Sequence, residues 1–417
     1  MSKALPLQGV KVADFGWLGI GPLTAMRLAI WGATVVRVES HTRPGSDRIQ
    51  APYKDGIPGI NRSGSFARMN RGKYGISINL NRPTGLAIAW RLIKWADVMD
   101  ENFTPGQMKK WGLDYESVKK VKPDIIYMTT NLMGGSGPYA AANGYGYQAA
   151  GVSGITYPIG WSDRGPSPYH AAYPDFANPR LGAAAILAAL HYRAKTGKGQ
   201  YLDQSQMEGI GYCLMAPHIM SYETDGVILE RSGNLNPSAA PHNVYPCKGD
   251  DRWCAIAVSN SEQWRALVAA MGRPELADDP RFSTLLERKK NEAELDALIA
   301  QWTVNMTRNE VETVLQKVGV PAHSVEDTRD LRKDPQLDYR QYWQRLTHSE
   351  MGDATYRGTG YTLSKGREVS LAAPCLGEHN EYVFKQILGM TDDEISEALI
   401  EGGITTDADL PEMKGAI

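Results

Sequence analysis

The stretch VKVADFGWLGIGPLTAMRLAIWGATVVRVE, residues 10–39, contains the patterns of a strand, a turn, a helix and a second strand in that order. VKVADF is typical of a buried strand, LTAMRLAIWG of a helix, and TVVRVE of a second strand. A helix that connects two strands in this way makes them parallel neighbours. The stretch therefore predicts an α/β fold with helices on the faces of a parallel sheet.

Three glycines lie in the turn after the first predicted strand. Gly16, Gly19 and Gly21, with Glu39 at the end of the second strand, are similar to a dinucleotide-binding turn. Their spacing is G-x-x-G-x-G rather than G-x-G-x-x-G, and Pro22 equally suits a helix that binds no pyrophosphate. We therefore interpret the glycines mainly as turn residues, and nicotinamide or flavin binding is the minor alternative.

The domain organisation follows from length and changes in composition. A chain of 417 residues is too long for one ordinary core. Residues 227–246 are rich in Ser, Asn, Pro and Gly and predict a linker, and strand and helix patterns resume after it. We expect a large domain over 1–226, the linker and a small α/β domain over 227–335, and a return segment over 336–417 that completes the large domain.

Charge and cysteine usage exclude several function classes. The net charge of −2 predicts no surface for nucleic acid or an anionic membrane. The N-terminus lacks the pattern of a signal peptide and no apolar run has the length of a membrane span, so we expect a cytoplasmic protein. The four cysteines form no CxxC and the eight histidines no HxxxH, which predicts neither a metal site nor a disulfide framework.

A lone carboxylate, Asp175, begins the stretch DFANPRLGAAAILAALHYRAKTGKGQ. Asn178 is the predicted N-cap and Pro179 the first residue of a helix that continues to Ala194, and a second helix is predicted over 202–224. Just upstream of a helix N-terminus, a carboxylate stays ionised, as an attacking nucleophile must. Most acidic residues in such a position only cap a helix, so the stretch alone leaves catalysis the minority interpretation.

Several segments spread over the whole chain decide between these interpretations. They resemble, in the same order, the family III CoA-transferases, the relatives of formyl-CoA transferase, carnitine CoA-transferase and α-methylacyl-CoA racemase. The segments are LQGVKVADFGWLGIGPLTAMRLAIWGATVVRVE, NRGK, ENFTPGQMKKWGLDYE, GGSGPY, Asp175, LAALHYRAKTGKGQYLDQSQMEG, DPRFSTLLERKKN and APCLGEHN.

The resemblance implies a fold and a mechanism. The fold is a Rossmann-like large domain plus a smaller α/β domain, with two chains threaded as interlocked rings, either a homodimer or a heterodimer with a related subunit. In the mechanism, Asp175 attacks an acyl-CoA, and CoA passes to a carboxylic acid acceptor through an aspartyl anhydride and an aspartyl-CoA thioester. Coenzyme A is the co-substrate, and no metal or redox cofactor is implied.

The resemblance also assigns binding residues. Asn102 and Phe103 stand where the family holds the nucleotide, Ile78 where an apolar residue packs on adenine, and Lys110 where an arginine meets a phosphate. Lysines and arginines are more often solvated surface charges. Further candidates for the phosphates are Lys73, Arg71 and Arg82.

Two departures from the family pattern bear on the reaction. Gly19 replaces a glutamine near the first turn, which implies different substrate contacts. Tyr145 and Gly146 replace the His-Asp pair of the racemases, and many transferases have an acid at the position of Gly146. A racemase needs acid–base groups on both faces of the α-carbon, so racemisation is disfavoured. Tyr145 is then the candidate to orient Asp175 by a hydrogen bond.

The acceptor is expected to meet residues around Asp175. His170, Tyr173 and Asn178 are candidates, and Arg180 could bind the second carboxylate of an acid such as succinate. The chain also resembles transferases that use succinyl-CoA and benzylsuccinate. Two alternatives remain open, namely an acyl-CoA racemase or isomerase and a non-catalytic CoA-binding subunit of a heteromeric transferase.

Overall fold

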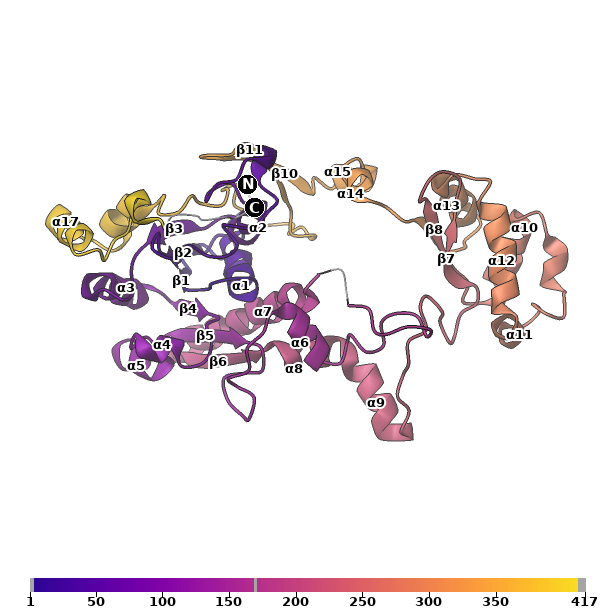
Figure 1. Cartoon of the computed structure of the whole chain (residues 1–417), viewed down its shortest axis with the longest axis horizontal. Coiled ribbons are helices and arrows are strands. Elements are labelled where there is room, and N and C mark those ends of the chain that lie inside the picture. Colours follow the sequence, from indigo (N-terminus) through magenta and orange to yellow (C-terminus); the bar gives the residue numbers. More distant parts are fainter. Residues whose placement is uncertain (1–3, 169–170, 412–417) are drawn as a thin grey trace. The chain divides into compact units, whose positions relative to one another are not determined.

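The computed structural model describes residues 4–168 and 171–411, which form two compact units (Figure 1). The large unit comprises the described residues of 1–156, 168–228 and 341–417, and the small unit comprises 157–167 and 229–340. In the described residues, no helix is both long and apolar enough to cross a membrane.

The small unit includes a segment that the change in composition did not reveal. Residues 157–167 belong to it together with 229–340, whereas the sequence placed the linker and small domain over 227–335. The Tyr157 hydroxyl donates a hydrogen bond of 2.8 Å to the Glu230 carboxylate, which ties the added segment to the rest of this unit. Pairing between distant segments therefore defines the unit, and a single linker does not.

A parallel sheet of six strands forms the centre of the large unit as far as it is described. Its order is β3-β2-β1-β4-β5-β6, the order of doubly wound sheets, with the chain reversing direction across the sheet between β1 and β4. The predicted α/β fold class is therefore confirmed. The strands are β1 (Lys11–Asp14), β2 (Thr34–Glu39), β3 (Tyr74–Ser77), β4 (Val98–Glu101), β5 (Ile126–Asn131) and β6 (Gln200–Ser205).

Helices cover both faces of this sheet (Figure 1). The helices of the large unit are α1 (Ile20–Ala29), α2 (Gly64–Asn70), α3 (Pro83–Trp95), α4 (Gln107–Lys110), α5 (Tyr115–Val121), α6 (Gly146–Val152), α7 (Tyr173–Thr196), α8 (Gln206–Ile210), α9 (Ala216–Asp225), α16 (Asn380–Tyr382) and α17 (Asp392–Ile400). A hairpin of β10 (Trp343–His348) and β11 (Gly352–Arg357) also belongs to this unit.

The strand residues alternate between two hydrophobic cores. Val12 and Val35 pack with residues of α1 and α7, whereas the next residues, Ala13 and Val36, pack with residues of α3. All four side chains are fully buried. Successive side chains of a strand point to opposite faces, so a sheet covered on both sides has apolar residues at consecutive positions.

The small unit has its own sheet and core. The antiparallel strands β7 (His242–Pro246), β8 (Trp253–Ala257) and β9 (Ala322–Ser324) pack with helices around the buried Trp264 and Phe282. The helices are α10 (Ser261–Ala270), α11 (Leu285–Lys290), α12 (Glu292–Thr303), α13 (Arg308–Lys317), α14 (Thr328–Leu331) and α15 (Pro335–Tyr339). Strand β7 lies where the sequence predicted only a linker.

The helix α7 begins earlier than the sequence predicts. It starts at Tyr173, so Asp175 lies in its first turn and Asn178 is inside the helix rather than at its N-cap. The Asn178 amide is buried and donates to the backbone oxygens of Pro174 and Gln206 at 3.1 and 3.2 Å. Its side chain therefore serves a tertiary contact, which local capping preferences do not reveal.

The predicted helix over 202–224 is also wrong in its first part. Residues up to Ser205 form β6, which pairs with β5, and the shorter helices α8 and α9 follow. Exposure alternates along most of β6, as expected for a strand at the edge of a sheet. The apolar residues after Ser205 have helical spacing. The prediction therefore extended that helix over the short polar strand before them.

Buried charged groups connect the turn between β1 and α1 to neighbouring segments. Lys73 is fully buried, and its Nζ donates to Asp14 Oδ2 at 2.6 Å, to the Pro22 backbone oxygen at 2.8 Å and to Asn70 Oδ1 at 2.8 Å. Burial lowers the pKa of Lys73 to about 8, while Asp14 opposes this shift. The predicted contact of Lys73 with a CoA phosphate is therefore wrong, because its three N–H donors all have protein acceptors.

We predict that the substitution Lys73→Met lowers the free energy of unfolding by about 3 kcal/mol, because the buried Asp14 would lose its close charge partner and keep only Arg37 at 3.9 Å. Urea denaturation followed by circular dichroism measures the change. The control is Lys110→Met, at an exposed lysine, where the expected change is within about 0.5 kcal/mol. Unchanged stability of the Lys73 variant together with weaker CoA binding would contradict the structural role.

Candidate active site

A cavity of about 590 Å³ lies at the carboxyl ends of the strands of the large unit. Every strand of the six-stranded sheet contributes a lining residue at its end or within a residue or two of it. Ligands of doubly wound sheets bind at this edge, beside the point where the strand order reverses. These residues are Phe15, Glu39, Ile78, Asn102, Asn131 and Gln206, after or at the ends of β1, β2, β3, β4, β5 and β6.

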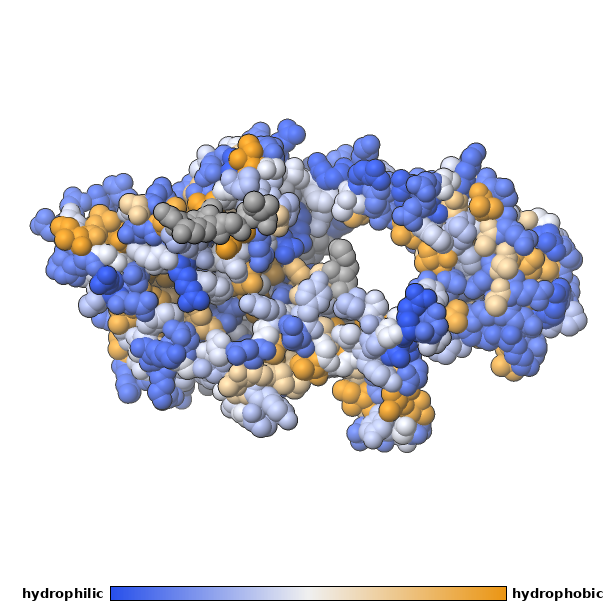
Figure 2. Space-filling model, viewed as in Figure 1, coloured by the Kyte–Doolittle hydropathy of each residue, from blue (hydrophilic) through white to orange (hydrophobic). Residues whose placement is uncertain are grey.

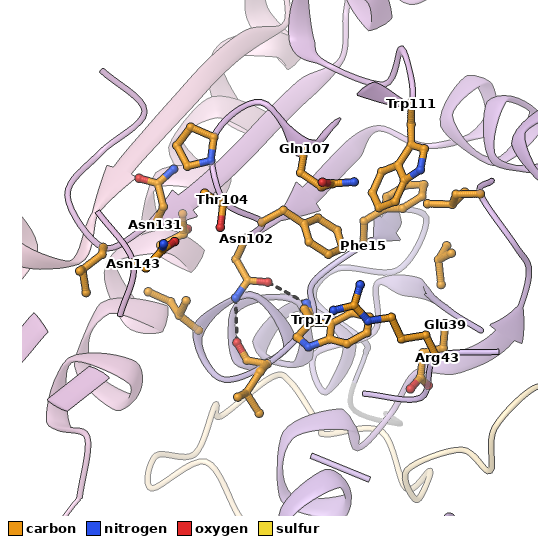
Figure 3. A pocket seen from close by; sticks show the side chains of 18 of the residues that line it. Phe15, Trp17, Glu39, Arg43, Asn102, Thr104, Gln107, Trp111, Asn131 and Asn143 are labelled. Atoms are coloured by element: carbon orange, nitrogen blue, oxygen red, sulfur yellow. Dashed lines mark hydrogen bonds between the residues drawn. The ribbon is translucent and has the colours of Figure 1, made fainter. Parts of the chain in front are cut away.

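Aromatic side chains form one wall of the cavity (Figure 3). The ring of Phe103 lies between Trp17 and Trp111, with centroid distances of 6.1 and 5.5 Å. The guanidinium group of Arg43 lies over the Trp17 ring at 5.3 Å. Flat apolar surface next to a cation suits a base and its phosphates.

Sequence reasoning did not select Trp17, Trp111 or Arg43. Trp17 follows the first strand and could have been found from its place in the turn before α1. Arg43 lies in a long polar loop, where no local pattern separates it from its solvated neighbours.

Asp175 reaches the same cavity from the first turn of α7. The backbone N–H of Gly146 and the side-chain amide of Gln206 lie close enough to this carboxylate to favour its ionised form. Burial raises its pKa to about 6, although these two groups and the positive charge of Arg68 act in the opposite direction. The helix N-terminus predicted an easily ionised carboxylate, but desolvation outweighs the helix field. The group is therefore ionised at neutral pH and more basic than an ordinary aspartate.

Two glycines press against this carboxylate. A Cβ atom at Gly146 would lie 2.5 Å from Asp175 Oδ2 and 2.6 Å from Ala172 Cβ, so no side chain fits there without movement. Gly19 has φ +65°, and a Cβ atom there would lie 3.3 Å from Asp175 Cγ. The resemblance implies an acidic side chain at position 146 in many transferases. In this chain the backbone of Gly146 contacts Asp175 directly instead.

The structure brings the uncharged residues expected at the nucleotide, together with Tyr145, to the cavity. Ile78, Asn102, Phe103 and Tyr145 all line it. The Asn102 amide already has protein partners, since it accepts from Trp17 N and donates to the Leu18 backbone oxygen, both at 2.7 Å (Figure 3). Asn102 thus shapes the turn that carries Trp17. Tyr145 is 71 % exposed, and the groups that hold Asp175 are Gly146 and Gln206 instead.

The basic residues expected at the phosphates lie elsewhere. Arg71 is buried, with an ion pair of 3.0 Å to Glu368, so its predicted role is wrong for the same reason as that of Lys73. Lys110 and Arg82 are exposed and do not line the cavity. Helix α4 does reach the cavity, but through Gln107.

None of the described residues expected to contact the acceptor lines the cavity. Arg180 is exposed, does not line the cavity, and donates a hydrogen bond to the Phe176 backbone oxygen. Asn178 is buried beneath Gln206. Tyr173 is exposed at the first position of α7, and His170 lies outside the described residues.

Among the described residues, no group of three or more His, Cys, Asp or Glu side chains could hold a metal ion. The cavity thus combines one mostly buried, basic carboxylate, that of Asp175, with an aromatic wall.

Comparison with known proteins identifies the family. A model of CoA-transferase family III matches residues 7–380. The chain belongs to this family. It is therefore a CoA-transferase, and the resemblance that the sequence motifs indicated is confirmed.

Relatives of this CoA-transferase cover nearly its whole length. The succinyl-CoA–D-citramalate CoA-transferase of Chloroflexus aurantiacus is 34% identical over 94% of this chain and 96% of its own. The β subunit of the succinyl-CoA–L-malate CoA-transferase of that bacterium is 29% identical over 95% and 97%. The crystal structure of a CAIB/BAIF family protein from Brucella suis has a TM-score of 0.83 at 31% identity and covers 92% of this chain and 99% of that one.

We predict that Gly146→Ala lowers kcat about 100-fold, because the added methyl group displaces the Asp175 carboxylate, and misplacement of a reacting group by an ångström has an effect of that order. Steady-state kinetics measures it. Gly151→Ala in the same helix is the control, since a Cβ atom there has no neighbour within 4 Å. Equal kcat values for the two variants would show that the contact at Gly146 is unimportant.

The raised pKa of Asp175 also predicts a pH-dependent stability. The folded protein holds this proton more tightly than the unfolded chain, so ionisation costs stability as the pH rises from the ordinary pKa of 3.8 through about 6. Asp175→Asn should therefore raise the free energy of unfolding at pH 8 by roughly 1–3 kcal/mol and change it little at pH 4. Denaturant titrations at both values test this, with the exposed Asp250→Asn as control. A gain that is equal at both pH values would exclude ionisation as its cause.

Proposed function

We propose that this enzyme transfers CoA from an acyl-CoA donor to a carboxylic acid acceptor through covalent intermediates on Asp175. The observation that carries the proposal is a single basic carboxylate, held by Gly146 and Gln206, on the wall of a cavity large enough for a substantial part of a CoA thioester. A carboxylate in such a position is a suitable nucleophile, because it is ionised near neutral pH yet poorly solvated.

The first half of the reaction uses two exchanges at Asp175. One carboxylate oxygen attacks the thioester carbon of the donor, the C–S bond breaks, and an acyl-aspartyl anhydride and CoA thiolate form. The thiolate then attacks the aspartyl carbonyl carbon, the former acyl group leaves as its carboxylate, and CoA remains as an aspartyl thioester. The free energy of the donor thioester is thus kept first in the anhydride and then in the aspartyl thioester.

The second half repeats these steps with the acceptor. Its carboxylate attacks the aspartyl thioester and releases CoA thiolate, which then attacks the acceptor carbonyl carbon of the new anhydride. The products are acceptor-CoA and the free Asp175 carboxylate. Gly146 N–H and the Gln206 amide hold the aspartyl oxygens throughout, and the buried setting limits hydrolysis of the two reactive intermediates.

We assign the nucleotide part of CoA to the aromatic wall. Phe103 and Trp111 offer apolar ring surface to adenine, with Ile78 beside them in the same lining. Arg43 takes the role for phosphate that the sequence gave to Lys73 and Lys110, because its guanidinium group lies at the cavity and lacks a carboxylate partner among the described residues.

We propose succinyl-CoA as donor and a short dicarboxylic acid as acceptor. Both named relatives use succinyl-CoA with a dicarboxylic acid. Arg68 supports this choice, because it acts electrostatically on Asp175, lies 5.2 Å over the Phe176 ring, and has no carboxylate ion pair in the described part of the chain. Neither Arg68 nor Arg180 lines the cavity, and both are exposed, but only Arg68 acts electrostatically on Asp175, so we assign the second carboxylate to Arg68. Benzylsuccinate as an acceptor stays a prediction.

We also propose that two chains assemble as interlocked rings, as the resemblance implies. Apolar side chains are exposed over α9 and the π-helix Gly211–Met215 before it (Figure 2), among them Tyr212, Ile219, Met220 and Tyr222. Surfaces of this kind are common at subunit interfaces. One relative is the β subunit of a transferase, so a related subunit could take the place of a second copy.

Trapping of the intermediates tests the mechanism. We predict that the enzyme mixed with succinyl-CoA and then with hydroxylamine carries a hydroxamate on Asp175, detected by mass spectrometry of the peptide. Formation should increase with pH around a midpoint of about 6, because only ionised Asp175 attacks. Acetyl-CoA, which lacks the second carboxylate, should label the enzyme more slowly.

The variant Asp175→Asn provides the control for this experiment. It should bind CoA and form no adduct. CoA transfer by this variant, or an unmodified Asp175 in active wild-type enzyme, would exclude the covalent route. Deuterium exchange at the α-carbon of an acyl-CoA without CoA transfer would instead identify an isomerase.

A further inference from the structure

Three polar side chains form a row across β4, β5 and β6 near the carboxyl ends of these strands. Glu101 pairs in register with Thr129, and Thr129 pairs in register with Asp203. The two acids at the ends of the row accept hydrogen bonds from backbone N–H groups. Glu101 Oε2 accepts from Phe103 N at 2.8 Å, and Asp203 Oδ1 accepts from Gly135 N at 2.9 Å. The row therefore connects the sheet to the two loops that follow β4 and β5, and both loops contribute to the cavity lining.

Glu101 is the buried acid of this row. It is the last residue of β4 and is only 5 % exposed, whereas Asp203 is exposed. Phe103 is half-buried, and residues 104–106 after it are exposed. The hydrogen bond from Phe103 N–H to Glu101 thus fixes the backbone of the loop just before the loop leaves the sheet. This backbone carries the ring that lies between the two tryptophans of the aromatic wall.

The surroundings of Glu101 disfavour its ionised form. Burial raises its pKa to about 7, and Asp203 acts in the same direction, whereas the N–H group that it accepts opposes both effects. The other titratable groups near it are Tyr127 and Tyr201, and burial raises the pKa of both, so they stay neutral. Asp100 precedes Glu101 in β4, so its side chain points to the opposite face of the sheet. No lysine or arginine of the described residues forms an ion pair with Glu101, and its charge therefore changes near neutral pH.

The charge of Glu101 affects the strength of its hydrogen bond to Phe103. An ionised carboxylate accepts an N–H group more strongly than the carbonyl oxygen of a protonated carboxyl group does. The fraction of molecules in which the Phe103 ring is held in place therefore increases as the pH rises through about 7. A ligand that packs on this ring binds with an apparent affinity that is proportional to that fraction.

We propose that Glu101 is a positioning residue for CoA: its carboxylate holds the Phe103 backbone, and its ionised form places the Phe103 ring for the nucleotide more firmly than its protonated form does. Asp203 adjusts this effect, since its negative charge opposes the ionisation of Glu101. The inference rests on the proposed function, because it requires the nucleotide part of CoA to pack on Phe103. Glu101 itself does not line the cavity, so it acts only through the loop.

The test measures the dissociation constant of CoA by isothermal titration calorimetry for the wild-type enzyme and for Glu101→Gln. Glutamine keeps an acceptor oxygen at the same reach but has no charge. The ratio of the variant constant to the wild-type constant should rise from about 1 near pH 5.5 to about 5–10 near pH 8.5, with a midpoint of about 7. Groups that titrate on CoA and on Asp175 are the same in both proteins, so their effects cancel in the ratio. A ratio of one at every pH would overturn the proposal.

The substitution Asp203→Asn gives a second measurement without any change at the buried site. Asparagine keeps an acceptor for Gly135 N–H but removes the charge that raises the pKa of Glu101. This variant should bind CoA about 2-fold more tightly than the wild-type enzyme near pH 6.5 and equally well near pH 8.5. The matched control is Glu116→Gln, at an exposed glutamate of α5, which should have wild-type constants throughout.

A merely structural role would give a different pattern. Glu101→Gln would then weaken CoA binding by the same factor at every pH, and Asp203→Asn would have the wild-type constants at both pH values. Either result would overturn the proposal, because each shows that the charge of Glu101 has no effect on CoA.

The substitution Phe103→Leu separates failure of this role from failure of the proposed function. It keeps an apolar side chain without the ring and should weaken CoA binding roughly 10-fold. Unchanged CoA binding by this variant would show that the nucleotide packs elsewhere, and it would overturn the assignment of the aromatic wall together with the role of Glu101. Weaker binding by Phe103→Leu with a ratio of one for Glu101→Gln would overturn the role of Glu101 alone.

Discussion

The buried contact of Lys73 with Asp14 is the constraint on which the active site depends. Through its three hydrogen bonds, Lys73 connects the end of β1, the start of α1 and the end of α2. Arg37 acts beside it, because its guanidinium group donates to the backbone oxygens of Gly16 and Trp17 at 2.8 and 3.1 Å. Hydrogen bonds from two buried cations, Lys73 and Arg37, therefore fix the turn between β1 and α1. This turn carries Trp17 of the aromatic wall and Gly19, the residue that contacts Asp175.

Sequence pattern predicts the central sheet well because burial on both faces leaves a simple signal. Val12 and Ala13, or Val35 and Val36, are apolar in succession since each packs against a different layer of helices. Pattern fails where a tertiary contact overrides a local preference. Asn178 is a residue type that often caps helices. Its amide instead donates to the backbone oxygens of Pro174 and Gln206, and the helix starts before it.

The candidate site shows the same division. Asp175 could be selected because a family resemblance marks its position, and its place in the first turn of a helix is close to the expected one. The groups that hold it could not be selected, since Gly146 and Gln206 are distant in sequence and one of them acts only through its backbone. Cations were the least predictable residues. Lys73 and Arg71 are structural, whereas Arg43 and Arg68, in segments without a distinctive pattern, lie near the cavity or the nucleophile.

The distribution of the lining residues over all six strand ends has an evolutionary consequence. Each strand supplies its contact from its own carboxyl end or from the residue directly after it. A substitution at one strand end can therefore alter one contact with the substrates while the sheet keeps the other strand ends in register. Those strand ends whose side chains do not touch one another usually behave additively. New acceptor preferences can then arise by single steps, each of which leaves a folded and partly active enzyme for selection to act on.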